Sequence, residues 1–357
     1  MESFGVGFRP QTTPSNGRLR AFTGFGGEKS GMRSLRKVPV ALLIGVVALV
    51  ATTLTAGAGG TTTPSLGTGP GAVDPASVSG AYQLDGGAWA VPLKSEKPDW
   101  LTPEMEQQAK GKPQPAPKEA QEAVGPDVPL SGFVGIRPGS WMISPAGCTM
   151  NFVFQKSGVY AIGTAGHCVD SVGQEVTLVT IAPGEPPSPE NLVLVNIGRV
   201  ISRTENGIGA DFALVSIKPE LQPWVFPTIA QVGGPCGVYS AEGLVSVDGW
   251  NAVIRGEEPI EAGETVWHYG HGLAVGTGGT PRAGAAGAWT PDAYYWAGAV
   301  SFGDSGSAAR VGTLEAAGNV THLVVDLRYA GYNAGTRITK MLQLASGYEL
   351  VNSPYCG

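Results

Sequence analysis

A serine lies between glycines in the stretch Gly303-Asp304-Ser305-Gly306, which predicts a tight turn. Glycine adopts backbone angles that other residues resist, so such a turn exposes the Ser305 hydroxyl and lets another backbone approach closely. The N–H groups of Gly303 and Ser305 are then placed to bind an oxyanion that develops when the hydroxyl attacks a carbonyl. A serine hydroxyl is a weak nucleophile, and it requires a base that a third group orients.

A histidine and an aspartate elsewhere in the chain can supply this help. His167 follows an apolar run over 161–165, and Asp211 opens another over 211–217. In these roles His167 takes the Ser305 proton and later returns it, while Asp211 orients the imidazole and stabilises its cation. Alternatively, His167 is a satisfied core histidine and Asp211 a turn residue at a strand edge. The order of the three motifs favours catalysis.

Three segments carry a family resemblance: Thr-Ala-Gly-His-Cys at 164–168, Asp-Phe-Ala-Leu at 211–214 and Gly-Asp-Ser-Gly-Ser at 303–307. In this order they resemble the chymotrypsin-fold (trypsin-like) serine peptidases, above all the bacterial streptogrisin-like branch. The resemblance implies an all-β fold of two antiparallel six-stranded β-barrels with the active site in the cleft between them. It also implies hydrolysis of peptide bonds through an acyl-enzyme, without a cofactor.

The resemblance places the floor of a specificity pocket at Ala299 and one wall at Asp326 and Arg328. The floor has no acid, so a preference for Lys or Arg is not supported. The small apolar segment 297–300 favours an apolar or aromatic substrate side chain. The family usually has Ser and Gly where this chain has Asp326 and Arg328. That departure motivates an alternative function, a peptidase-fold binding protein with an occluded or inactive site.

Four cysteines behind an export signal indicate two disulfides, for which three connectivities are possible. The resemblance pairs Cys148 with Cys168, so that the histidine loop is tied to its neighbouring strand. Cys236 and Cys356 are left as the second pair. No Cys-x-x-Cys spacing occurs, and we expect no metal site.

Three further residues lie near these motifs. We expect Asp304 to be a buried carboxylate that holds the oxyanion turn, with Arg255, Arg282 or a processed N-terminus as its partner. We expect His268 and His271 to be exposed loop histidines, because two ligands alone do not make a metal site.

Residues 1–58 are expected to be an N-terminal extension and a secretory signal. A basic head at 32–37 precedes an apolar run of about 18 residues and the small residues 56–58. Cleavage after Ala58 is favoured, although an uncleaved signal-anchor over 38–56 is the alternative. Met32 is a second candidate for the start of translation. Either way the rest of the chain is expected outside the cytoplasm, secreted or membrane-anchored and facing outward.

Residues 59–127 are rich in Gly, Thr and Pro and then in Lys, Pro, Gln and Glu, which predicts a disordered linker or a pro-segment. A plain spacer is favoured over 108–127. Thr102 and Pro103 predict the start of one short helix, as N-cap and first-turn residues.

From residue 128 to 357 the composition is that of a single β-rich peptidase-like domain. Short apolar runs bounded by Gly, Pro, Asp or Ser predict strands of two barrels, over about 128–225 and 233–345. One helix is expected over 339–345. The formal net charge of −6 argues against nucleic acid as a partner. A protein or peptide substrate and a monomeric chain are expected.

Overall fold

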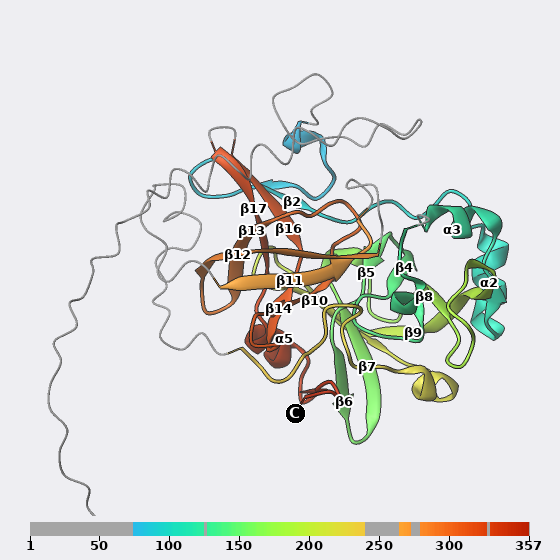
Figure 1. Ribbon diagram of the computed structural model, residues 1–357. Coiled ribbons are helices and arrows are strands. Elements are labelled where there is room, and N and C mark those ends of the chain that lie inside the picture. The colour runs from blue at the N-terminus through green and yellow to red at the C-terminus, as the bar shows by residue number, and fades with distance from the viewer. Residues whose placement is uncertain (1–73, 125–126, 240–263, 273–278, 327–328, 357) are drawn as a thin grey trace, which may run out of the picture. The chain divides into compact units, whose positions relative to one another are not determined.

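A computed structural model of the chain describes residues 74–124, 127–239, 264–272, 279–326 and 329–356 (Figure 1). Two antiparallel sheets, here called sheet one and sheet two, form the framework of this part of the chain. The expected all-β architecture with two antiparallel sheets is therefore confirmed. The signal or anchor segment 38–56, Met32 and Ala58 lie outside the described residues.

Sheet one has the strand order β18-β6-β7-β10-β9-β8-β4-β5, with β3 paired to β9. Its strands are β3 (Gln114–Pro115), β4 (Trp141–Ser144), β5 (Cys148–Thr149), β6 (Val153–Lys156), β7 (Val159–Thr164), β8 (Glu175–Ile181), β9 (Leu192–Glu205), β10 (Asp211–Ser216) and β18 (Glu349–Leu350).

Sheet two has the order β1-β2-β16-β17-β13-β12-β11-β14-β15. Its strands are β1 (Tyr82–Gln83), β2 (Trp89–Pro92), β11 (Thr265–Gly270), β12 (Thr280–Trp289), β13 (Ala293–Gly298), β14 (Ala308–Val311), β15 (Ala316–Asn319), β16 (His322–Asp326) and β17 (Tyr329–Thr336).

Among the described residues each sheet has nine strands rather than six, and two of the three additional strands in each come from outside the expected barrels. The pair β1 and β2 extends sheet two beside β16, while β3 and β18 extend sheet one. The apolar run 132–136 begins in a 3-10 turn, η2 (Leu130–Phe133), and continues with isolated bridges at Val134 and Ile136. The apolar run 244–254 lies outside the described residues.

In the part of the chain that the structure describes, short helical turns and three α-helices connect and cover the strands. The α-helices are α2 (Pro103–Gly111), α3 (Lys118–Ala123) and α5 (Ile338–Leu344); the remaining 3-10 turns are η1 (Pro75–Ser77), η3 (Gly166–Cys168), η4 (Pro189–Asn191) and η5 (Pro219–Trp224). The predicted helix start is confirmed, since the Thr102 side chain accepts a hydrogen bond from the N–H of Met105 at 3.3 Å. No helix among the described residues is both long and apolar enough to span a membrane.

Residues 108–127 were expected to be a spacer, and for the described part this is wrong. The helices α2 and α3 and the strand β3 pack on sheet one, where Ala109 and Ala120 join a buried cluster with Ile143 and Leu194. The composition of this segment did not predict the packing, because a few alanines bury little apolar surface by themselves. They gain a core only from the apolar face that sheet one already offers.

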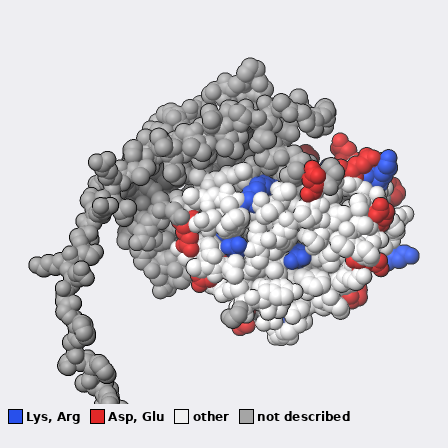
Figure 2. Space-filling model, viewed as in Figure 1, with Lys and Arg blue, Asp and Glu red and all other residues white. Residues whose placement is uncertain are grey.

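Both disulfides have the expected pairing, Cys148 with Cys168 and Cys236 with Cys356. Acidic and basic side chains are interspersed over the described face shown in Figure 2. Several of them pair with each other, as Lys97 does with Glu106 and Lys110 with Glu175.

Candidate active site

The turn around Ser305 depends on two glycines. Gly303 has φ +103° and Gly306 has φ +89°, backbone angles that side chains resist. A Cβ on Gly306 would lie 2.2 Å from the carbonyl oxygen of Thr149. The turn is closed by a hydrogen bond from the N–H of Ser307 to the carbonyl of Asp304, at 2.9 Å. The local sequence thus forces the backbone into the geometry that the motif predicts.

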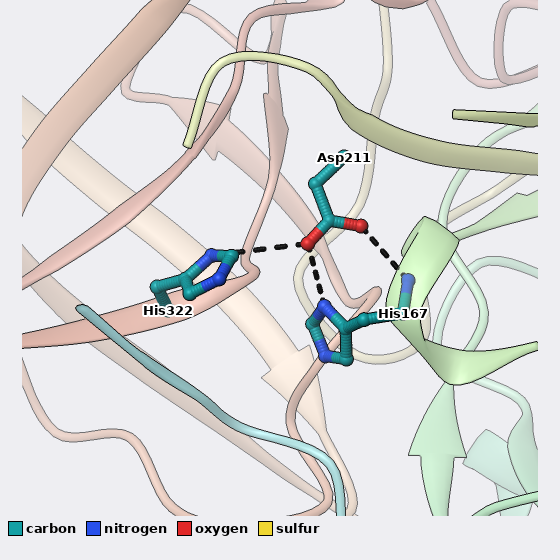
Figure 3. Close-up of side chains that lie close together, drawn as sticks. All are labelled: His167, Asp211 and His322. Atoms are coloured by element: carbon teal, nitrogen blue, oxygen red, sulfur yellow. Dashed lines mark hydrogen bonds and ion pairs between the residues drawn. The ribbon is translucent and has the colours of Figure 1, made fainter. Parts of the chain in front are cut away.

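The fold brings the three predicted catalytic side chains into one hydrogen-bonded line. Nδ1 of His167 lies 2.5 Å from Oδ2 of Asp211, and Nε2 lies 2.6 Å from Oγ of Ser305. Figure 3 shows the contact between the imidazole and the carboxylate. With Nδ1 donating to Asp211, Nε2 is free to accept the proton of Ser305. This arrangement can generate a serine nucleophile.

Asp211 is held from both sheets. Its Oδ1 accepts the backbone N–H of His167 at 3.0 Å, which fixes the carboxylate toward the histidine. From sheet two, Asn319 donates its side-chain N–H to the carbonyl of Asp211, and Thr336 accepts the Asp211 N–H. Burial acts to raise the pKa of Asp211, but the adjacent His167 outweighs burial and holds this pKa below its ordinary value.

The Cys148–Cys168 disulfide links the two halves of the site. Cys168 follows His167, and Cys148 precedes Thr149. Thr149 donates its N–H to the carbonyl of Ser305 at 2.8 Å and its hydroxyl to the carbonyl of Gly303 at 2.9 Å. The disulfide therefore keeps the histidine loop close to the strand that holds the serine turn.

Asp304 is buried beneath the turn, and its partner is Arg282 on β12. The Arg282 guanidinium pairs with Asp304 and also donates to the carbonyl of Gly270. The N–H groups of Ser301 and Gly272 donate to the Asp304 carboxylate at 2.7 Å each. Burial acts to raise the pKa of Asp304, but Arg282 outweighs it and the pKa lies below its ordinary value. A new N-terminus is not needed to hold this turn.

We expect Arg282→Gln to destabilise the fold by about 3–5 kcal/mol, because it leaves the Asp304 charge buried without its partner. Peptidase turnover should fall as well, since the turn that carries Ser305 loses its support. Chemical denaturation and turnover measure the two effects. Arg199→Gln is the matched control: this arginine pairs with Glu175 at the surface, and its loss should cost at most about 1 kcal/mol. Equal effects in the two variants would contradict the assigned role.

The N–H groups of Gly303 and Ser305 both donate to one oxygen, the carbonyl of Leu93, at 2.6 and 3.3 Å. Two backbone donors that converge on a carbonyl oxygen beside a serine hydroxyl are the geometry of an oxyanion hole. The sequence analysis named these two N–H groups but gave no role to Leu93. The apolar run 88–93 in an otherwise polar segment was the available signal.

His322 on β16 is a further buried residue at the site, and sequence reasoning missed it. Its Nδ1 lies 3.8 Å from Oδ2 of Asp211 and 2.8 Å from the hydroxyl of Thr321 (Figure 3). Its ring contacts those of His167 and Tyr82 edge-on. Burial lowers the pKa of His322 to about 3, so the ring is neutral and packs against the carboxylate without competing for it.

His167, Asp211 and His322 are, among the described residues, a group whose ligand atoms lie within 4.8 Å of one another. Histidine and carboxylate are ligands that zinc accepts. His167 and Asp211 are, however, already bonded to each other, and a metal ion there would take the Nδ1 of His167 from its carboxylate. The expectation of no metal site stays a prediction.

Two of the three residues predicted for the specificity pocket lie in the described part of the chain. Ala299 is exposed, and its carbonyl accepts from Nε2 of His268 at 3.1 Å. Asp326 ends β16, and Arg328 lies outside the described residues. The floor and wall assigned by resemblance therefore remain predictions.

His268 and His271 are buried, so the expectation of exposed loop histidines is wrong. His268 lies on β11 beside Trp296, and His271 donates to the carbonyl of Gly139 at 2.7 Å and stacks on Trp141. The three-residue spacing of His268 and His271 does not indicate whether their side chains are buried. The packing of Trp296 on His268, and of Trp141, Phe133 and Tyr269 on His271, shields them from water.

Burial lowers the pKa of His268 and of His271 to about 4, from an ordinary value of 6.5. The unfolded chain therefore binds protons between pH 6.5 and 4 that the folded chain excludes, and stability falls as pH falls through this window. At pH 5 each histidine should lower the free energy of unfolding by up to about 2 kcal/mol relative to neutral pH. Melting temperatures at pH 7 and pH 5 test this, and His271→Gln, which keeps a donor for Gly139, should flatten the dependence. An unchanged slope in that variant would contradict the assignment.

No protein-family model matches the chain, and no curated protein sequence does either. Solved structures of bacterial serine proteases are similar to it. Protease A of Thermobifida fusca is 19% identical and aligns with 62% of this chain and 99% of its own, with a TM-score of 0.39. A Nocardiopsis protease is 19% identical (61% and 98%, TM-score 0.38), and a Cellulomonas bogoriensis chymotrypsin is 17% identical (61% and 98%, TM-score 0.37). We therefore infer the function from the geometry of the site.

Proposed function

We propose that this chain is an exported serine endopeptidase that hydrolyses peptide bonds through Ser305, His167 and Asp211. The observation that carries the proposal is one constellation. A serine hydroxyl lies 2.6 Å from the base, and two N–H groups beside it converge on a peptide carbonyl. Each group stands where acyl transfer from a peptide requires it.

The reaction follows from these positions. Ser305 Oγ attacks the peptide carbonyl as His167 takes its proton, and the N–H groups of Gly303 and Ser305 stabilise the oxyanion. His167 then protonates the leaving amine, and water hydrolyses the acyl-enzyme with the same base. Asp211 keeps the imidazole in the required tautomer throughout. Two disulfides and the signal-like segment 32–58 support export to an oxidising compartment.

A fluorophosphonate probe tests the proposal on the full chain, with the adduct located by mass spectrometry. We expect the adduct on Ser305, its loss in His167→Ala, and hydrolysis of casein by the unmodified chain only. A folded chain that takes no adduct and cleaves no peptide would instead fit the binding-protein alternative.

A further inference from the structure

The active site holds a peptide that belongs to the chain itself. Ser305 is 0% exposed and His167 is 4% exposed. The segment 89–95 runs through the site in extended form, with the carbonyl of Leu93 bound by the N–H groups of Gly303 and Ser305. The occlusion considered from the sequence thus has a source in this segment of the chain.

The residues before Leu93 are bound as an added β-strand. Strand β2 pairs antiparallel with β16, so that Pro92 lies opposite His322 and Ala90 opposite Val324 (Figure 1). The pairing continues into Leu93, whose N–H donates to the carbonyl of Thr321 at 3.0 Å. Main-chain hydrogen bonds to a sheet edge are a common way to bind an extended peptide.

The residues after Leu93 are bound as well. Ser95 and Gly147 exchange two backbone hydrogen bonds, at 2.8 and 3.0 Å. Lys94, which lies between Leu93 and Ser95, donates a hydrogen bond from its Nζ to the carbonyl of His167 at 3.1 Å. The peptide bond between Leu93 and Lys94 is therefore held on both sides, with its carbonyl in the oxyanion hole.

We propose that the chain hydrolyses its own Leu93–Lys94 bond. This inference rests on the proposed function. Ser305 Oγ bonds to the carbonyl carbon of Leu93 while its proton passes to His167. The carbon–nitrogen bond breaks, and Lys94 leaves as an amine with that proton. Water then attacks the acyl-enzyme, so that the products are a carboxylate on Leu93, an amino group on Lys94 and a free Ser305.

The uncleaved chain already has the parts that this reaction needs. Arg282, not a new amino group, pairs with Asp304 and holds the oxyanion turn. The His167–Ser305 and His167–Asp211 contacts are also formed with the peptide in place. Because no activation by another protease is required, the first turnover can be intramolecular.

The segment after the bond is anchored to the rest of the protein. Lys97 pairs with Glu106 on α2, and Glu106 accepts a hydrogen bond from Ser144 on β4. Leu101 and Ala109 lie in the buried cluster beneath α2 and α3. The processed protein therefore begins at Lys94 and keeps 94–124 as part of its fold, while the strands β1 and β2 are on the released side.

The bound segment also indicates the substrate class. Leu93 is 1% exposed and belongs to an apolar cluster with Trp296, Val300 and Leu323. A charged side chain there would lose its hydration without gaining a partner in that cluster. The site should prefer a leucine-like residue before the cleaved bond, in an extended peptide of the type Ala-Val-Pro-Leu.

Intact-mass and N-terminal analysis of the purified full chain tests the inference. We expect an N-terminus at Lys94 in the unmodified chain and an intact bond in Ser305→Ala. Leu93→Asp should remain uncut at this bond, whereas Leu93→Met, which stays apolar, should be cut. The rate should be independent of protein concentration over about a tenfold range, as for an intramolecular reaction.

A separate peptide keeps the test valid if Leu93→Asp fails to fold. The processed protein should cleave the peptide of residues 90–95 only between Leu and Lys, and should not cleave its counterpart with Asp for Leu. Cleavage of this bond in purified Ser305→Ala, or equal cleavage of both peptides, would overturn the inference. An intact Leu93–Lys94 bond in a chain that hydrolyses casein would also overturn the inference. That result would not contradict the proposed peptidase function. A chain without any hydrolysis or phosphonate adduct ends both proposals.

Discussion

Ser305→Ala reduces peptide turnover by about 10⁴-fold or more, because covalent catalysis is lost and only binding and the oxyanion hole remain. The change removes one oxygen, which lies 2.6 Å from Nε2 of His167 and 3.0 Å from the carbonyl of Thr321. The turn itself should persist, since Gly303, Gly306 and the Asp304 pair set its shape. Steady-state hydrolysis of casein or of a Pro-Leu peptide measures the loss.

Ser307→Ala is the matched control, two residues further along the same segment. The Ser307 hydroxyl faces His268 rather than His167, at 3.3 Å. This variant should keep most of the turnover. A similar loss in both variants would mean that the segment is sensitive to any change, and that Ser305 has no special role. Turnover retained by Ser305→Ala would exclude it as the nucleophile.

Asp211→Asn lowers kcat/KM by about 10⁴-fold, through the tautomer of His167. An asparagine side chain presents to Nδ1 of His167 either its NH₂ group, which donates, or its amide oxygen, which accepts more weakly than a carboxylate. With the amide donating to Nδ1, the imidazole proton moves to Nε2, and Nε2 no longer accepts the proton of Ser305. The fold should survive, because Asn319 and Thr336 bind the backbone of Asp211 and not its side chain.

Asp170→Asn is the control for this second variant. It removes the same charge three residues after His167, but its carboxylate is exposed and accepts a hydrogen bond from the side chain of Gln174. We expect unchanged kcat/KM in this control. The rate of phosphonate labelling should fall in Asp211→Asn and not in Asp170→Asn. Equal labelling rates would show that Asp211 does not control the base.

Much of the site could be read from local sequence. Glycines on either side of Ser305 are required by backbone angles that the turn itself imposes, so the motif is visible without any fold. Strand β7 ends at Thr164, three residues before His167, and β10 begins at Asp211. The parts of these strands over 161–164 and 211–215 are apolar runs because both their faces are buried. The start of α2 was likewise visible in Thr102 and Pro103.

The partners of these residues could not be read in the same way. Arg255, Arg282 and a processed N-terminus were all candidates for Asp304. Arg255 lies outside the described residues, and the register of β12 brings Arg282 to Asp304. The burial of His268 and His271 depends on tryptophans from distant segments. Such contacts are set by strand pairing over long sequence separations, which leaves no periodic signal near either residue.

The chemistry of the chain and its class of fold were thus readable from short motifs and apolar runs, since each is determined by neighbouring residues. What fills the site was decided by tertiary structure. The segment 89–95 has no catalytic motif, and its apolar residues alone do not say what they contact. It becomes a substrate-like strand only because β16 offers a free edge to β2 and the Ser305 turn offers two N–H donors to Leu93.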